Sequence, residues 1–460
     1  MSAAQTKRNG ALQNVWFLII DEVSMVSPLL LEEVDRRLRD ARKSQEPFGG
    51  IAMLTTGDFL QLKPVASASL ASVDESAGRA LWVTHFRTVV FLRANMRSRA
   101  DAQFAEVLER LRVGACTHAD IALLNTRVLS ATNQLDAASA SAAPIPILVP
   151  SNDERQALNR QAVAQMARNG VRITRLRGVL TRKRGAVAGL SDDVRQYVHA
   201  LPDSEQTSGL APTLDLYIGM PVSITHNIAT ALGLANGAVG RLAALPDAGW
   251  SSRVVMTTFD DGAPFEVPIV EALTMPPFVL VELSRAPKTR FSAALPPRVV
   301  PLLLMSDNVS VKLGGMQQSF RLQQFPIVPY HASTYHKAQG LSCDKLLVWR
   351  LPTAGDSLML YVALSRSRKL EGLYLNEPIT DAVVRRAVPS LDLFNELDRL
   401  DQLQAIELRS EPQALAARRQ PAVAVAAAAA TAAAAKASKA RYSASAASRE
   451  RAKKSKVNKS

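Results

Sequence analysis

Residues 15–22 read VWFLIIDE, an apolar run of six residues that ends in two adjacent carboxylates, Asp21 and Glu22. The run is too short to cross a membrane. It also lacks the alternation of polar and apolar residues that is typical of a strand with one solvent-exposed face. It therefore predicts a parallel strand that is covered on both faces, as in an α/β sheet. Ligands of open α/β sheets bind beyond the carboxyl ends of the strands, so the two carboxylates mark the place where chemistry is expected.

The segment after these carboxylates carries the signals of an amphipathic helix. Ser27 can cap its N-terminus, and Pro28 suits its first helical position. We expect one apolar face on this helix, made by Leu30, Val34, Leu38 and Ala41. Strand, loop and helix thus follow one another in the order of an α/β unit.

The same order returns further along the chain. Strands are predicted at 51–56, 88–92 and 145–149, and helices at 101–112 and 154–166. On the first of these helices the expected inward residues are Phe104, Val107, Leu108 and Leu111. A low-complexity segment at 135–144 separates two units, residues 170–325 are richer in Gly, Pro and short β-like runs, and the α/β pattern resumes over 330–399. The chain is predicted to be α/β, with two or three domains.

The net charge of +14 is concentrated near the C-terminus. Residues 411–460 contain eleven Lys or Arg and two Glu, a net charge of +9, which leaves +5 for residues 1–410. This tail has almost no large apolar groups after Val425, so burial cannot offset the entropy of ordering it. We expect it to be disordered, either as a solubilising tail or as a nucleic-acid or nuclear-targeting segment that uses RERAKKSK.

Other classes of protein fit the composition poorly. No apolar run approaches the roughly 18 to 20 residues of a membrane span, and the first twelve residues lack the apolar core of a signal peptide. Cys116 and Cys343 are too few and too far apart to suggest a disulfide framework or a zinc site. We therefore expect a soluble, unsecreted protein of a reducing compartment that has no membrane partner.

A buried strand that ends in Asp-Glu is the Walker B arrangement of nucleotide-hydrolysing motors. In such a site Asp21 would hold Mg²⁺, and Glu22 would orient and deprotonate the attacking water. The pair alone is weak evidence, because most such pairs begin a solvated loop. Asp58 and Gln61 strengthen it, since they follow the neighbouring strand and lie where a γ-phosphate can be sensed.

Further motifs follow in a fixed order. Arg97 is predicted at the start of a helix, and Arg366 in YVALSRSR can stabilise charge on a transferring phosphoryl group. The segment TYHKAQGLS offers donors and a turn suited to a phosphate backbone, through His336, Lys337, Gln339 and Gly340. Each residue taken alone also fits a structural role, as a surface ion pair, a buried ring or a turn. Their order taken together favours a nucleotide-driven motor on nucleic acid.

At these residues the sequence resembles the petite-integration-frequency (Pif) family of superfamily-one DNA helicases, which are close to the RecD-like helicases. LIIDEVSMVS is similar to the family's motif II, and FGGIAMLTTGDFLQLKPV to motif III. LRANMRS resembles motif IV, although Asn95 stands close to where the family usually has Gln. YHKAQGLSCDKLLV and YVALSRSRKLEGLYL are similar to motifs V and VI. The likeness spans about residues 15–376, and residues 99–127 are similar to versions in fungal and Helitron-transposon members.

The resemblance implies an ATP- and Mg²⁺-dependent helicase that moves 5′ to 3′ on single-stranded DNA. Its substrates would include forked or structured DNA, in repair, recombination or telomere maintenance. The basic segment RERAKKSK favours the nucleus, with the mitochondrion as the alternative. The resemblance also assigns roles to site residues. Asp21 would hold Mg²⁺, Glu22 would activate water, Asp58 and Gln61 would contact the nucleotide, Arg97 and Arg366 would be arginine fingers, Gln339 and Gly340 would link the nucleotide to the DNA, and His336 and Lys337 would contact DNA.

The implied architecture is a pair of tandem RecA-like P-loop NTPase domains. The first domain, incomplete, would cover residues 1–92, and the second would cover 93–240 together with 327–400. Residues 241–326 would form an inserted small β-barrel, because LDLYIGMPVSITHNIATALGLANGAVGRL resembles the stretch that precedes this barrel in the family. Residues 411–460 would form the disordered basic tail.

One element of the family is missing from these 460 residues. They contain no G-x-x-x-x-G-K-[ST] motif and no Gly-Lys pair, so the loop that cradles the β- and γ-phosphates is absent from them. In a RecA-like sheet the P-loop strand lies beside the Walker B strand. Without it we expect VWFLII to expose apolar side chains and backbone groups.

Three interpretations remain open. The chain is a motor whose P-loop segment lies outside these residues, or a degenerate and possibly transposon-derived relative that binds nucleic acid without hydrolysing ATP. The third interpretation is an unrelated α/β ATPase or metal-dependent hydrolase that uses Asp21 and Glu22. The sequence leaves the oligomeric state open.

Overall fold

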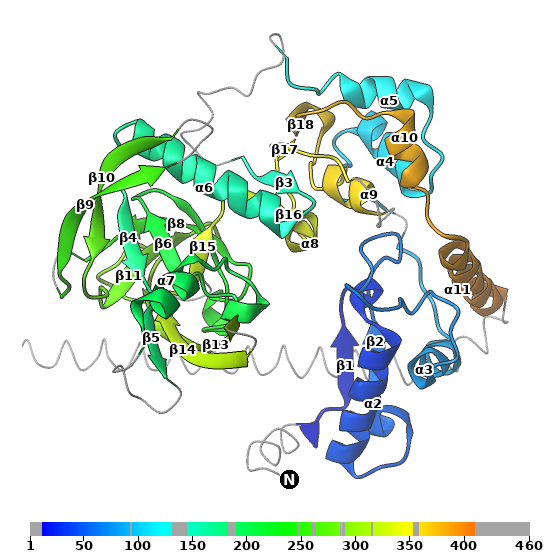
Figure 1. Ribbon diagram of the computed structural model, residues 1–460. Helices are drawn as coiled ribbons and strands as arrows, with labels where there is room; N and C mark the ends of the chain where they lie inside the picture. The colour runs from blue at the N-terminus through cyan, green and yellow to red at the C-terminus, as the bar shows by residue number, and fades with distance from the viewer. Residues whose placement is uncertain are drawn as a thin grey trace, which may run out of the picture. The chain divides into compact units, whose positions relative to one another are not determined.

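The computed structural model describes residues 12–92, 94–130, 145–182, 190–246, 249–259, 264–285, 287, 290–313, 316–352 and 358–409 (Figure 1). The low-complexity segment 135–144 and the basic tail 411–460 lie outside these ranges. The chain divides into two compact units. Unit 1 contains residues 1–59, 63–94 and 391–460, and unit 2 contains residues 60–62 and 95–390. No helix of the described ranges is both long and apolar enough to span a membrane.

Unit 1 is built around two parallel strands, β1 (Phe17–Ile20) and β2 (Ala52–Thr55), paired from Phe17 opposite Ala52 to Ile20 opposite Thr55. Within the described ranges β1 pairs with no other strand. One face of the pair is open, since Phe17, Ile19 and Leu54 are 52%, 57% and 44% exposed. The prediction that this strand is covered on both faces is therefore wrong, and the expected exposure of its apolar side chains is confirmed.

The helix predicted after the carboxylates is α2 (Pro28–Arg42). Ser27 caps it by accepting a hydrogen bond from the Leu30 amide at 3.1 Å, and the short helix η1 (Val23–Met25) precedes it. The predicted inward face is confirmed in part: Leu38 and Ala41 are buried, whereas Leu30 is exposed and Leu31 is buried in its place. Asp35, also buried on this helix, accepts a hydrogen bond from the amide of Phe48, in the turn η2 (Pro47–Gly50).

A buried carboxylate fixes the last described helix, α11 (Leu391–Arg409), onto α3 (Ala77–His85) within unit 1. Glu396 accepts hydrogen bonds of 2.7 Å from the Trp82 indole and from Arg79, and Arg399 bonds the same carboxylate. Burial acts to raise the pKa of Glu396, but the bonds from Arg399, Arg79 and Trp82 outweigh it and lower the pKa. A segment more than 300 residues from α3 in sequence thus completes this unit.

The strand predicted at 88–92 does not form. Residues 88–92 pair with no strand among the described ranges, and Val90 and Leu92 are exposed. An apolar β-branched run has strand propensity, but it becomes a strand only where a neighbouring ladder accepts its backbone groups.

Unit 2 contains a four-stranded parallel sheet in the order β16-β3-β17-β18. Its strands are Ala332–Thr334, Ile147–Val149, Leu346–Val348 and Leu373–Leu375, in that order. The accompanying helices are α4 (Ala102–Arg112), α5 (His118–Asn125), α6 (Asn152–Arg168), α8 (Tyr335–Ala338), α9 (Met359–Leu364) and α10 (Asp381–Arg386). The predicted inward face of α4 is confirmed, because all four of its apolar residues are buried. Figure 1 shows α6 running alongside β3 and β16.

The β-rich character predicted for 170–325 is confirmed. Three sheets form there, in the orders β6-β4-β10-β9, β12-β11-β8-β7-β15 and β13-β14-β5, with helix α7 (Asp192–Ala200) and the short helices η4 (Glu205–Thr207) and η5 (Thr230–Leu232). The strands β4 to β9 are Thr174–Arg177, Val179–Arg182, Thr213–Leu216, Pro221–Ile224, Val239–Ala244 and Ser252–Phe259. The strands β10 to β15 are Phe265–Ala272, Phe278–Leu283, Val299–Leu303, Met305–Leu313, Met316–Gln324 and Ile327–Pro329. The inserted β-barrel at 241–326 stays a prediction.

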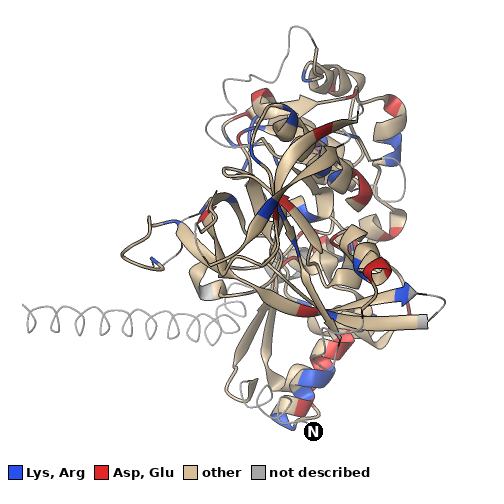
Figure 2. Cartoon of the chain, turned by 60° about the vertical axis from the view of Figure 1, so that its left-hand side comes forward, with Lys and Arg blue, Asp and Glu red and all other residues tan. Residues whose placement is uncertain are grey.

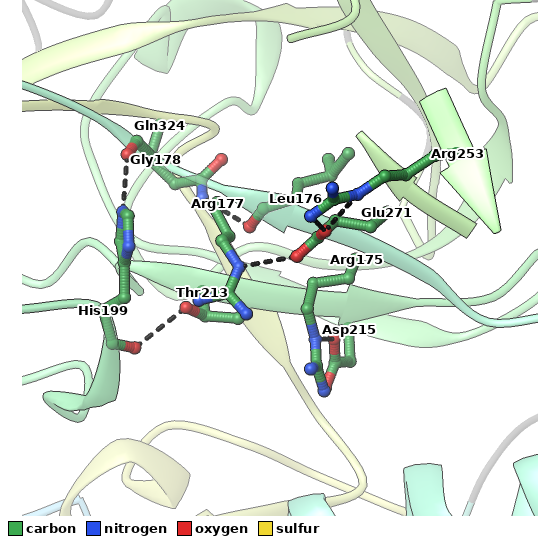
Figure 3. Close-up of polar contacts among 10 residues, drawn as sticks. All are labelled: Arg175, Leu176, Arg177, Gly178, His199, Thr213, Asp215, Arg253, Glu271 and Gln324. Carbon is green, nitrogen blue, oxygen red and sulfur yellow. Dashed lines mark hydrogen bonds and ion pairs between the residues drawn. The ribbon is translucent and has the colours of Figure 1, made fainter. Parts of the chain in front are cut away.

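Charged side chains of both signs are interspersed over the described elements (Figure 2). The densest network crosses the sheet β6-β4-β10-β9 (Figure 3). Arg175 bonds Asp215 through two contacts of 2.7 and 2.8 Å, and Arg177 and Arg253 share the buried carboxylate of Glu271. These arginines bind carboxylates of neighbouring strands, so their first role is to hold the sheet together.

We expect Glu396→Ala to lower the free energy of unfolding by about 3 kcal/mol, because it leaves buried donors without their acceptor. The pKa of Glu396 is lowered, so its contribution is complete above the ordinary value of 4.5 and is lost as the pH falls through the folded value. Urea unfolding of wild type and variant should therefore converge in acid. Asp398→Ala, at an exposed position of the same helix, is the control. An equal loss in both variants would contradict this account.

Candidate nucleotide and nucleic-acid site

The carboxylate of Asp21 is held at the end of β1 by its neighbour strand. Its Oδ1 atom accepts hydrogen bonds from the Glu22 amide at 2.9 Å and from the hydroxyl of Thr56. These bonds, that from Thr56 first, lower the pKa of Asp21, so the exposed carboxylate is ionised at neutral pH. An ionised, exposed oxygen donor is what Mg²⁺ uses when it binds through one carboxylate and keeps several waters.

Sequence reasoning missed Thr56, although a signal for it exists. In the parallel pair Ile20 lies opposite Thr55, so the next residues of the two strands, Asp21 and Thr56, come together. The Thr56 amide continues the ladder by donating to the Ile20 carbonyl at 2.8 Å. A parallel alignment of the two strands in this register therefore predicts that the Asp21 carboxylate lies beside the Thr56 hydroxyl.

Glu22 adopts a left-handed backbone conformation, with φ 54° and ψ 48°. This conformation costs a non-glycine residue about 1–2 kcal/mol, and such strain gathers at functional sites. The surrounding backbone enforces it, since the Val23 amide donates to the Thr56 carbonyl at 2.9 Å. Gly57 permits this approach, because a Cβ there would lie 2.7 Å from the Val23 nitrogen. The strand end thus presents two adjacent carboxylates in a fixed backbone.

Asp58 and Gln61 follow β2, as predicted. Asp58 is half-buried in unit 1. Gln61 belongs to unit 2 and is half-buried between Leu60 and Leu62, which are both buried. Packing of these two leucines holds the backbone on either side of Gln61 in place. The contact of either side chain with a nucleotide stays a prediction.

The predicted position of Arg97 at a helix start is wrong. Arg97 lies in the loop ahead of α4, which begins at Ala102 with Asp101 as its capping residue. The half-buried guanidinium donates from Nε to the Ser342 hydroxyl at 2.8 Å and from Nη1 to the Ser365 carbonyl at 3.2 Å. The loop is therefore tied to two segments that lie far from it in sequence.

Arg366 is 1% exposed and is the largest fully buried side chain of the described residues. Its Nε atom donates to the Val362 carbonyl at 2.8 Å, and Nη2 donates to the Ser365 hydroxyl at 2.7 Å. The structure thus brings the two predicted arginine fingers, Arg97 and Arg366, to the same residue. Sequence reasoning missed Ser365 and Ser342, although both stand inside the quoted motifs.

The four predicted DNA-contacting and coupling residues lie in one turn after β16. His336 and Lys337 are on α8, Gln339 ends this helix, and Gly340 follows with a left-handed φ of 78°. The Lys337 side chain is exposed, yet partial desolvation of its ammonium group and the nearby Arg155 lower its pKa, and Asp203 offsets this only in part. The turn lies at the carboxyl end of a parallel strand, where α/β sheets bind ligands.

These features define a class: an α/β protein in which a parallel strand ends in two adjacent carboxylates. Pif1 helicase from Bacteroides, solved with ADP-AlF3 and single-stranded DNA, matches this fold with a TM-score of 0.59. It is 21% identical, and the match covers 87% of this chain and 78% of that one.

Sequence comparison finds similar helicases. A family model described as PIF1-like helicase matches residues 2–121. The human ATP-dependent DNA helicase PIF1 is 27% identical over 394 residues, which cover 80% of this chain and 48% of that protein. The mouse protein of the same name is 26% identical over 369 residues, with coverages of 77% and 44%. The chain is thus similar to Pif1 helicases in sequence and in fold, and it spans less than half the length of these curated relatives.

We expect Thr56→Val to raise the pKa of Asp21, because the Thr56 hydroxyl is the main cause of its lowering. Carbon-detected NMR titration of the Asp21 carboxyl measures this directly. Thr55→Val, one residue earlier on β2, is the matched control and should leave the titration unchanged. An unaltered pKa in Thr56→Val would show that the contact does not hold the carboxylate.

Proposed function

We propose that this chain supplies the Walker B carboxylates and the arginine fingers of an ATP-dependent DNA helicase that moves 5′ to 3′. One observation carries the proposal: an ionised Asp21 and a strained Glu22 stand together at the end of a parallel strand. Such a strand end suits Mg²⁺ and the polarisation of an attacking water. Similarity to Pif1 helicases supports the same reaction.

Each predicted site residue would have its own role in phosphoryl transfer. Asp21 would hold Mg²⁺, which neutralises charge on the phosphates when it is bound, and Glu22 would take the proton of the water. Arg97 and Arg366 would stabilise the developing negative charge. Asp58 and Gln61 would contact the nucleotide, with Gln61 coupling the γ-phosphate to the DNA.

The motor also requires a P-loop, which these 460 residues do not contain. The open face of the β1–β2 pair supports this requirement, because Phe17, Ile19 and Leu54 would be covered by a further strand and its helix. A P-loop-bearing segment packed there would bring its phosphate-binding backbone amides to the strand ends where Asp21 lies. We therefore propose that the active motor contains such a segment in addition to these residues.

Single-stranded DNA would be the track, with forked or structured DNA as the substrate. His336, Lys337 and Gln339 would contact the phosphate backbone, and Gly340 would allow the turn that joins this contact to the nucleotide site. The solved Bacteroides relative contains single-stranded DNA, which supports this partner. We place the activity in repair, recombination or telomere maintenance, in the nucleus, with the mitochondrion as the alternative.

A second candidate function is nucleic-acid binding without ATP hydrolysis, as in a degenerate relative. The observation that favours it is the absence of any G-x-x-x-x-G-K-[ST] motif from these residues. The two functions differ in one respect that can be measured, since only the first gives DNA-stimulated turnover once a P-loop is supplied.

We expect the 460-residue chain to hydrolyse ATP no faster than background. Losing even one preorganised donor at such a site costs roughly 10² to 10³ in rate, and the whole P-loop is lacking here. A longer polypeptide that carries a P-loop ahead of Met1 should show DNA-stimulated turnover. In that polypeptide Glu22→Gln should abolish turnover and spare nucleotide binding.

Glu32→Gln, at an exposed position of α2, is the matched control and should leave turnover intact. Robust turnover by the 460-residue chain would overturn the proposed need for a P-loop. A longer polypeptide that folds and binds DNA but hydrolyses no ATP would support the second candidate function.

We expect the chain to bind single-stranded DNA with little sequence preference and with an affinity that falls as salt rises. Deleting residues 411–460 removes eleven basic side chains and should make the slope of log affinity against log salt shallower. Fluorescence anisotropy across a salt series measures this slope. A slope that does not change would mean that the tail makes no contact with the DNA.

A further inference from the structure

Ser365 is the point at which the two predicted arginine fingers meet. Its carbonyl accepts a hydrogen bond of 3.2 Å from Arg97, and its hydroxyl accepts one of 2.7 Å from Arg366. Ser365 is itself buried. One residue therefore contacts both guanidinium groups, through its backbone on one side and its side chain on the other.

The hydroxyl of Ser365 has only one orientation that satisfies all of its neighbours. It donates to the Val362 carbonyl at 3.1 Å, and the same carbonyl accepts from Nε of Arg366 at 2.8 Å. A hydroxyl has one donor, so the bond to Val362 leaves its lone pairs for Nη2 of Arg366. The three groups close a ring that fixes the rotamer of Arg366.

The backbone that carries Ser365 is held rigidly. The segment from Ser342 to Asp344 lies beside the segment from Ser365 to Arg368, joined by a bridge between Cys343 and Ser367. The Cys343 amide donates to the Arg366 carbonyl at 2.9 Å, and the Arg368 amide donates to the Cys343 carbonyl at 3.1 Å. Ser342, on the first segment, is the other anchor of Arg97.

We propose that Ser365 is a positioning residue that holds Arg97 and Arg366 in one joint arrangement, with Ser342 as the second anchor of Arg97. This inference rests on the proposed function, because it assigns how the two arginines of that site are oriented. Groups that stabilise a transition state act well only when they are preorganised, and a small misplacement costs much of the rate. Any displacement of the Ser365 backbone would move both arginines together.

The contacts can be tested in the 460-residue chain by NMR of the arginine guanidinium N–H groups. Removal of the hydroxyl in Ser365→Ala should speed hydrogen exchange at Nη2 of Arg366, and Ser342→Ala should do the same at Nε of Arg97. Ser365→Thr keeps the hydroxyl and should restore protection. Ser98→Ala is the matched control, because this buried serine lies next to Arg97 and its hydroxyl has no hydrogen-bond partner among the described residues.

The consequence for catalysis can be tested in the longer, P-loop-bearing polypeptide. We expect Ser365→Ala to lower kcat about tenfold with little change in the KM for ATP, and Ser365→Thr to recover most of the rate. A mere loss of folding would not be rescued selectively by the threonine hydroxyl.

The outcomes separate this inference from the proposed function. Unchanged kcat in Ser365→Ala, in a polypeptide whose wild type is active, would overturn the inference alone. Unchanged arginine exchange in Ser365→Ala would overturn it as well. An inactive wild type would overturn the proposed function. Faster exchange at Arg366 in the Ser365→Ala variant of the 460-residue chain would still support the positioning role of Ser365.

Discussion

The parallel pairing of β1 with β2 is the interaction on which the candidate site depends. Its register sets Asp21 beside Thr56, and the resulting hydrogen bond lowers the pKa of the Asp21 carboxyl. The same register brings the Val23 amide to the Thr56 carbonyl and forces Glu22 into a left-handed conformation. Two short strands thus give two neighbouring carboxylates different environments, one held by hydrogen bonds and one held by a strained backbone.

In unit 2, too, a few hydrogen bonds join segments that lie far apart in sequence. The loop ahead of α4, the loop after α8 and the end of α9 are far apart in sequence, yet Arg97 of the first loop bonds Ser342 of the second and Ser365 at the end of α9. These hydrogen bonds tie the two loops to the end of the helix. A residue that contacts both arginines ties the orientation of one guanidinium to that of the other.

Much of the fold, and less of the site, follows from the sequence. Strand ends, caps and the inward face of α4 depend on local signals, and these predictions are confirmed. The inward face of α2 is predicted only in part, since Leu31 is buried in place of Leu30, and Arg97 lies ahead of a helix that begins later than predicted. Partners such as Thr56 for Asp21 and Glu396 for Trp82 are brought in by tertiary packing, which a local pattern does not encode.

The central claim is that the end of β1 is a cation site built on Asp21. Mn²⁺, used as a paramagnetic probe in place of Mg²⁺, tests it in the 460-residue chain through the broadening of backbone amide signals. The account predicts that the amides of Glu22 and Thr56 broaden in the wild type, and that this broadening disappears in Asp21→Asn. Broadening that persists in Asp21→Asn, or that is absent near Glu22 in the wild type, would contradict the account.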